Sequence, residues 1–383
     1  MTLAFSRPTA RPTARPTTRI ARGAALPAIA ATLALALAGC APAASDGGAA
    51  GDGAGAKAVT LVVHDSFPNE EFAVAASEAT GYDVEVISAG DGGELTNKLV
   101  LTKGAPIADA FFGVDTIFAS RLVANDVVEP YRTDGLSEGF EYLAVFPDDA
   151  DEASSGPFAL TPVDQGATCV NIDPAWFADK GIAEPASYED LTKPEYRDLT
   201  VLLDPTASST GASFLVGTVA EFGEDGFADY WQALMDNGAR IEQGWSDAYN
   251  GQFTQGGGEG TKPIVVSYGS SPAFTLSEDG SATTSKALLD TCSNQVEYAG
   301  VLAGAENPAG AKAVIDYLVS SEFQKTIPDA MYMYPVDSDV ELPADWASFA
   351  PLPSEDQLNG LASDEIEAGR EGWLKTLGEQ IGL

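Results

Sequence analysis

VTLVVHDSF at residues 59–67 is the first of three apolar segments that decide the fold. DVEVIS at 83–88 and ADAFFGVD at 108–115 follow it, and the segments between them have the spacing of apolar residues that is typical of helices. Strands that alternate with helices predict a parallel sheet with right-handed crossovers. The polar residues that follow these strands should meet at one edge of the sheet, and they are His64, Asp65, Ser66, Asp91, Gly92 and Asp115.

The rest of the chain predicts a second lobe built in the same way. PVDQGATCVNID at 162–173 and NQVEYAG at 294–300 are strand-like segments that would cross between the lobes. We therefore expect a bilobed α/β fold, with two parallel or mixed sheets joined by two hinge crossovers. The first lobe would comprise 58–163 and 298–383, and the second 164–297. Asn307 and Pro308 predict the start of a helix that runs through SSEFQ, and an amphipathic helix should begin near Ser363.

Aromatic and hydroxyl side chains gather in GWSDAY at 244–249 and IVVSYGSSPAF at 264–274. The second segment predicts a buried strand that delivers Tyr268 to the sheet edge, close to the serines that follow. Such a group suits a flat ligand that forms hydrogen bonds. The alternative is that Trp245 and Tyr268 are ordinary core residues. Ser208 and Ser209 precede an apolar helix, where they could bind a ligand hydroxyl or phosphate or could simply cap the helix.

Residues 1–39 have the features of a secretory signal peptide. The segment has five arginines and no acidic residue, followed by a short apolar run that ends in Leu-Ala-Gly before Cys40. This ending resembles a bacterial lipobox, which predicts acylation of Cys40; the alternative is a plain secretory signal. Residues 40–57 are rich in Ala and Gly and are expected to form a flexible tether.

Composition excludes several classes of function. The net charge of −37 argues against nucleic acid as a partner. The chain has one histidine and lacks GxSxG and HExxH motifs, so we expect no catalytic residues, no cofactor and no metal site. Cys169 and Cys292 are expected either to form a disulfide outside the cytoplasm or to remain two buried thiols.

VVHDSF, GDGGELTNKL, ADAFFGVD, LDP followed by SSTG, GWSDAY, SYGSSPAF, QVEYAG and MYMYPV occur in this order over about residues 59–375. Together with the lipobox, they resemble extracellular solute-binding proteins of ABC importers, and among these the thiamine-binding periplasmic proteins. The resemblance implies thiamine or a thiamine phosphate as ligand, permease and ATPase subunits as partners, a monomeric state, and an extracytoplasmic location at the membrane.

The same resemblance implies which residues bind the ligand. They are Asp91, Gly92, Ser208, Ser209, Trp245, Tyr268, Gly269, Ser270, Ser271 and Phe274, with His64 and Tyr332 where relatives often have other aromatic residues. Thr206 stands where some relatives have an arginine.

Another cationic solute is the alternative ligand. Ferric iron carriers of this type resemble one another in an adjacent Tyr-Tyr pair, whereas here Met333 separates Tyr332 from Tyr334. A polyamine would suit so acidic a chain, although it would not explain GWSDAY with SYGSSPAF.

Overall fold

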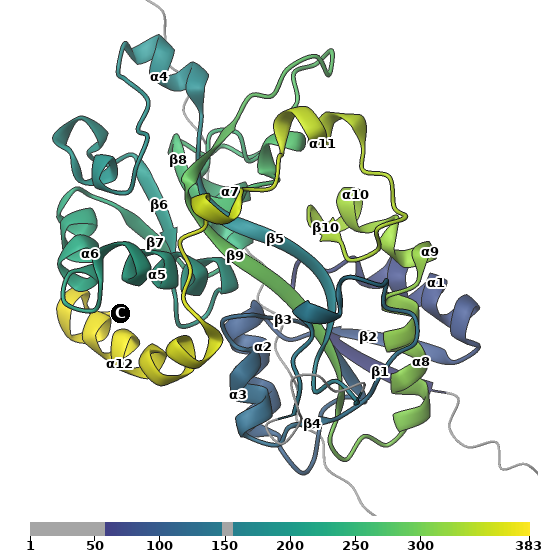
Figure 1. The fold of residues 1–383 in the computed structure, drawn as a ribbon. Helices are drawn as coiled ribbons and strands as arrows, with labels where there is room; N and C mark the ends of the chain where they lie inside the picture. The colour runs from purple at the N-terminus through teal and green to yellow at the C-terminus, as the bar shows by residue number, and fades with distance from the viewer. Residues whose placement is uncertain (1–57, 148–155) are drawn as a thin grey trace, which may run out of the picture. The chain divides into compact units, whose positions relative to one another are not determined.

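One mixed sheet organises the computed structural model, which describes residues 58–147 and 156–383. Its strand order is β2-β1-β3-β9-β5-β8-β6-β7, with β10 paired to β5 and β4 to β9 (Figure 1). The strands are β1 (Ala58–Val63), β2 (Asp83–Ser88), β3 (Ala110–Asp115), β4 (Val128–Glu129), β5 (Thr161–Ile172), β6 (Thr200–Leu203), β7 (Arg240–Glu242), β8 (Ile264–Tyr268), β9 (Lys286–Leu302) and β10 (Tyr334–Pro335). The predicted leader, the acylation of Cys40 and the tether lie outside the described residues.

Each half of the sheet contains parallel strands. In the first half β1 pairs in parallel with β2 and β3, which confirms the predicted arrangement. In the second half β6 pairs in parallel with β7 and β8. The two long strands β5 and β9 lie at the positions of the predicted crossovers. They pair antiparallel with each other, so the two sheets expected from the sequence are joined into one.

The helices cover the sheet and connect its strands. They are α1 (Asn69–Thr80), α2 (Gly92–Leu101), α3 (Ala119–Ala124), α4 (Pro174–Lys180), α5 (Ser209–Phe222), α6 (Phe227–Asp236), α7 (Trp245–Gln252), α8 (Pro308–Leu318), α9 (Ser321–Gln324), α10 (Ile327–Met331), α11 (Ala344–Phe349) and α12 (Ser363–Ile381). Asn307 caps α8 as predicted, because its side chain accepts a hydrogen bond from Gly310 N. The prediction of a single helix through SSEFQ is wrong. Helix α8 ends at Leu318, and Ser320 caps the separate helix α9.

The core fills both faces of the first half of the sheet. Val59, Leu61 and Val63 of β1 belong to one apolar cluster, which also contains Phe72 of α1 and Val314 of α8. Val62 points to the other face, because side chains alternate along a strand. The cluster on that face includes Leu95 of α2 and continues to Trp231 of α6 and Leu377 of α12. One core therefore extends across the two halves of the sheet.

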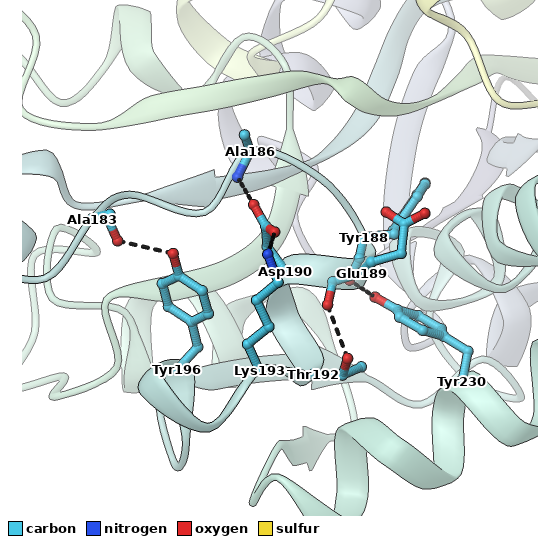
Figure 2. Close-up of polar contacts among 9 residues, drawn as sticks. All are labelled: Ala183, Ala186, Tyr188, Glu189, Asp190, Thr192, Lys193, Tyr196 and Tyr230. Carbon is cyan, nitrogen blue, oxygen red and sulfur yellow. Dashed lines mark hydrogen bonds and ion pairs between the residues drawn. The ribbon is translucent and has the colours of Figure 1, made fainter.

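The connection from α4 to β6 is irregular and is held by its own polar groups (Figure 2). Asp190 accepts a hydrogen bond from Ala186 N at 2.8 Å and pairs with Lys193, and Tyr196 donates to Ala183 O at 3.0 Å. The Lys193 ammonium lowers the pKa of Asp190.

None of the helices in 58–147 and 156–383 is long and apolar enough to cross a membrane.

Candidate functional site

The ends of β1 and β2 meet at the predicted edge of the sheet. Asp65 N donates to Gly90 O, and Gly90 N donates to the Asp65 carboxylate, both at 3.0 Å. His64 lies directly over Gly113, where an added Cβ would come within 2.1 Å of the imidazole. Burial lowers the pKa of His64, and the charges of Asp91 and Asp65 oppose that shift.

Asp91 joins this edge to the second half of the sheet. One of its carboxylate oxygens accepts a hydrogen bond from Gly92 N at 2.7 Å, at the start of α2. The other accepts a hydrogen bond from Trp245 N at 3.2 Å, at the start of α7. Asp91 therefore holds the first turn of a helix from each half.

Trp245 supplies the largest aromatic surface of the site. Its ring stacks on Tyr249 with centroids 4.8 Å apart and planes 11° apart, and it lies 6.1 Å from the ring of Tyr268. Its indole Nε1 donates to Ser267 Oγ at 2.9 Å, and this hydroxyl also bonds to Ser271 Oγ. These contacts fix the indole plane before a ligand arrives.

Two cavities adjoin at Trp245. The first has about 410 Å³, and its lining residues include Asp65, Asp91 and Glu94. The second has about 230 Å³ and is lined by aromatic and polar groups, including His64, Tyr268 and Tyr332. Ser66, Trp245 and Ser246 line both. Together we call these two cavities the cleft; their volume suits a small ligand.

Seven of the predicted ligand residues do not line the cleft. They are Gly92, Ser208, Ser209, Gly269, Ser270, Ser271 and Phe274. Ser208 caps α5, and Ser270 donates to Tyr332 O. Phe274 packs against Tyr332 and Trp346. Ser270 and Phe274 thus support the wall that Tyr332 forms, and Ser271 bonds to the Ser267 hydroxyl that holds the indole of Trp245.

A row of three buried carboxyl groups lies at the centre of the sheet. Glu297 of β9 is directly opposite Asp115 of β3 on one side and Asp164 of β5 on the other. Residues that are directly opposite in antiparallel strands share a face, with their Cβ atoms about 5 Å apart. A bulge precedes Val114 on β3 and Asp164 on β5, and the register after these bulges aligns the carboxyl groups.

Glu297 lines the second cavity, and sequence reasoning assigned it no role. The signal for it was present in QVEYAG, where one acidic residue stands in an otherwise buried segment, and PVDQG has the same feature at Asp164. Burial raises the pKa of Glu297 well above its usual range, and the charge of Asp164 raises it further. Burial also raises the pKa of Asp115 to about 7.

The raised pKa of Asp115 gives a testable dependence of stability on pH. The folded protein keeps a proton on this carboxyl that the unfolded chain loses near pH 4, so the free energy of unfolding should fall as the pH rises from about 4 to 7. The contribution of this group is at most about 4 kcal/mol. Asp115→Asn should remove this part of the slope in urea unfolding of the ligand-free protein.

Asp126→Asn is the matched control, because the Asp126 side chain is 88% exposed. It should keep the slope of the original protein. Parallel slopes for the original protein and Asp115→Asn would show that Asp115 titrates normally.

A disulfide joins the two long strands beside the site. Cys169 of β5 and Cys292 of β9 are bonded with S–S 2.00 Å, and both are buried. An added Cβ at Gly269 would lie 3.1 Å from Cys169 Sγ, so the disulfide packs directly beneath the turn that follows Tyr268.

No group of three or more His, Cys, Asp or Glu side chains in the described part of the chain is arranged to hold a metal ion.

Known proteins resemble this chain in sequence and in fold. The family model of bacterial extracellular solute-binding proteins matches residues 105–367. The thiamine-binding periplasmic protein of Brucella suis biovar 1 (strain 1330) is 27% identical over 325 residues, which cover 82% of this chain and 90% of that protein. The protein of the same name from Escherichia coli (strain K12) is 30% identical over 213 residues, which cover 54% of this chain and 62% of that protein.

Solved structures share the fold. A periplasmic thiamin binding protein superposes with a TM-score of 0.70 at 22% identity, covering 85% of this chain and 96% of that chain. The apo ferric ion-binding protein A of Pasteurella haemolytica superposes with a TM-score of 0.63 at 18% identity, covering 85% and 98%. The resemblance and the predicted fold class are thereby confirmed, and the chain belongs to the bacterial extracellular solute-binding proteins.

Proposed function

We propose that this protein is the substrate-binding component of an ABC importer and that it captures thiamine in the cleft. The observation that carries the proposal is the second cavity, where the aromatic side chains of Trp245, Tyr268 and Tyr332 surround a space that also touches the Glu297 carboxyl. The related proteins of Brucella and Escherichia coli are thiamine-binding periplasmic proteins, which supports the same ligand here.

The chemistry of thiamine suits these groups. Its thiazolium ring is permanently cationic, and its aminopyrimidine ring is flat. A cation over an aromatic face gains about 0.5–2 kcal/mol, and stacked rings gain about 0.5–1.5 kcal/mol beyond the area that they bury. Asp91 lines the first cavity and Glu297 the second, so each of the two cavities that Trp245 lines also contains an acidic residue.

The parts predicted from the sequence complete the proposal. Acylation at Cys40 would anchor the protein to the membrane, and residues 40–57 would tether a monomeric body formed by the lobes 58–163 with 298–383 and 164–297. Movement of the lobes about β5 and β9 would close the cleft over the ligand and present the closed form to the permease. The protein would have no catalytic activity of its own.

Free thiamine should bind more tightly than thiamine monophosphate. Among the described residues that line the cleft none is Lys or Arg, whereas Asp65, Asp91, Glu94, Asp247 and Glu297 are acidic. A phosphate in this field lacks a cationic partner, so we expect the monophosphate to bind at least about tenfold more weakly, which corresponds to 1.4 kcal/mol. Calorimetric titration of the purified protein with both compounds measures the ratio.

Spermidine is the third ligand for the same titration. A saturable one-to-one heat with thiamine, and none with spermidine, is the expected result. Binding of spermidine without binding of thiamine would contradict the proposal and would make the acidic cleft a polyamine site.

A further inference from the structure

The carboxyl row of Asp115, Glu297 and Asp164 has no ion-pair partner among the described residues. Asp115, Asp164 and Glu297 are 0%, 0% and 4% exposed. Isolated buried carboxylates are costly, so such groups either keep a proton or wait for a cation.

In the ranges that the structure describes, the Glu297–Asp164 pair also lacks the hydrogen bonds that would stabilise two buried carboxylates. Within the described part of the chain, no N–H or hydroxyl group donates to either oxygen of Asp164. The polar neighbour of Asp164 is the Glu297 carboxyl, which lies within hydrogen-bonding reach. Two carboxyl groups in such contact share one proton, because both cannot ionise at this separation.

Only one member of the pair reaches the ligand space. Glu297 lines the second cavity beside Trp245 and Tyr268, whereas Asp164 lies behind it on β5. A cationic group in that cavity would meet Glu297 first and would then be the missing counter-charge for the pair.

We propose that the Glu297–Asp164 pair is the cation-recognition element of the cleft, and that it holds a proton while the cleft is empty and releases it when a cationic ligand enters. This inference rests on the proposed function for the identity of the ligand. One positive charge enters as one proton leaves for solvent, so the net charge of the buried site is unchanged.

Other titratable groups lie around the pair on the neighbouring elements. They are Asp115 of β3, Asp91 at the start of α2, Tyr268 of β8 and His64 after β1, with Arg370 of α12 acting on Asp115 from farther away. The acidic members favour retention of the proton in the empty cleft. The pKa of His64 is lowered by burial, so this imidazole does not supply the positive charge.

Proton release distinguishes this arrangement from simple electrostatic attraction. Titration of thiamine in buffers with different enthalpies of ionisation reports the protons released for each molecule bound. We expect release of up to one proton near neutral pH, and a dissociation constant that falls as the pH rises, by up to about tenfold for each pH unit. Infrared difference spectra should show the carbonyl band of a protonated carboxyl disappearing when thiamine is added.

Two near-isosteric variants test the assignment. Glu297→Gln removes the proton that can leave, so proton release and the pH slope should disappear and affinity at neutral pH should fall. Asp164→Asn removes the acidic partner but leaves Glu297 buried, and burial by itself raises the pKa of Glu297, so binding should persist and proton release should be smaller but still present. Subtracting the variants from the original protein also removes any protonation of thiamine itself.

The outcomes separate this inference from the proposed function. Thiamine binding without proton release and without loss of the infrared band would overturn the inference and leave the proposed function standing. If the protein binds spermidine and not thiamine, the proposed function fails, and the same proton measurement with spermidine then decides the inference. If neither cation binds, both are overturned.

Discussion

Trp245→Ala should weaken thiamine binding by about tenfold to a hundredfold, which corresponds to about 1.4–2.8 kcal/mol. The indole lines both cavities of the cleft. Its orientation is fixed because it stacks on Tyr249 and its Nε1 donates a hydrogen bond to Ser267 Oγ. Alanine removes the aromatic surface but keeps the backbone N–H that bonds to Asp91. The loss should therefore appear in affinity, which calorimetric titration measures.

Two control variants separate this effect from general destabilisation. Trp176→Ala removes a partly buried indole of α4, which packs on Phe177 and does not line the cleft. Its affinity for thiamine should be unchanged. Trp245→Phe keeps an aromatic face without the Nε1 donor and should fall between the original protein and Trp245→Ala. Equal affinities for Trp245→Ala and the original protein would show that the indole is part of the scaffold.

Local patterns were sufficient to predict much of the fold. The apolar runs of β1, β2 and β8 and the helical spacing of α1 and α12 lie where the structure has these elements, because each carries its own signal of burial. Trp245 was predicted as a site residue, but its place in the first turn of α7 was not. Aromatic and Asp residues are weak helix formers, so tertiary contacts such as that with Asp91 decide this helix.

The carboxyl row could not be predicted in the same way. Asp115, Asp164 and Glu297 come from three distant segments, and only the register across β3, β9 and β5 makes them neighbours. That register depends on two bulges, which add a residue to one strand without any regular sequence pattern. Ser208 shows that one local signal can have two meanings, because a serine before a helix suits a ligand site and also the helix cap that the structure contains.

Removal of the disulfide should lower the free energy of unfolding by about 2–4 kcal/mol. Cys169 and Cys292 are 123 residues apart in sequence, so the bond closes a long loop and strongly restricts the unfolded chain. Cys169→Ala with Cys292→Ala removes the bond without burying a hydroxyl group. Urea unfolding monitored by circular dichroism measures the change.

A reductant provides the internal control for this experiment. It should lower the stability of the original protein once unfolding exposes the bond, and it should leave the double alanine variant unchanged. Thiamine affinity should change little in the variant, because neither cysteine lines the cleft. If reductant has no effect on the original protein, residual structure in the unfolded chain must already restrict the loop, and the disulfide would then serve mainly to hold β5 and β9 in register beneath the site.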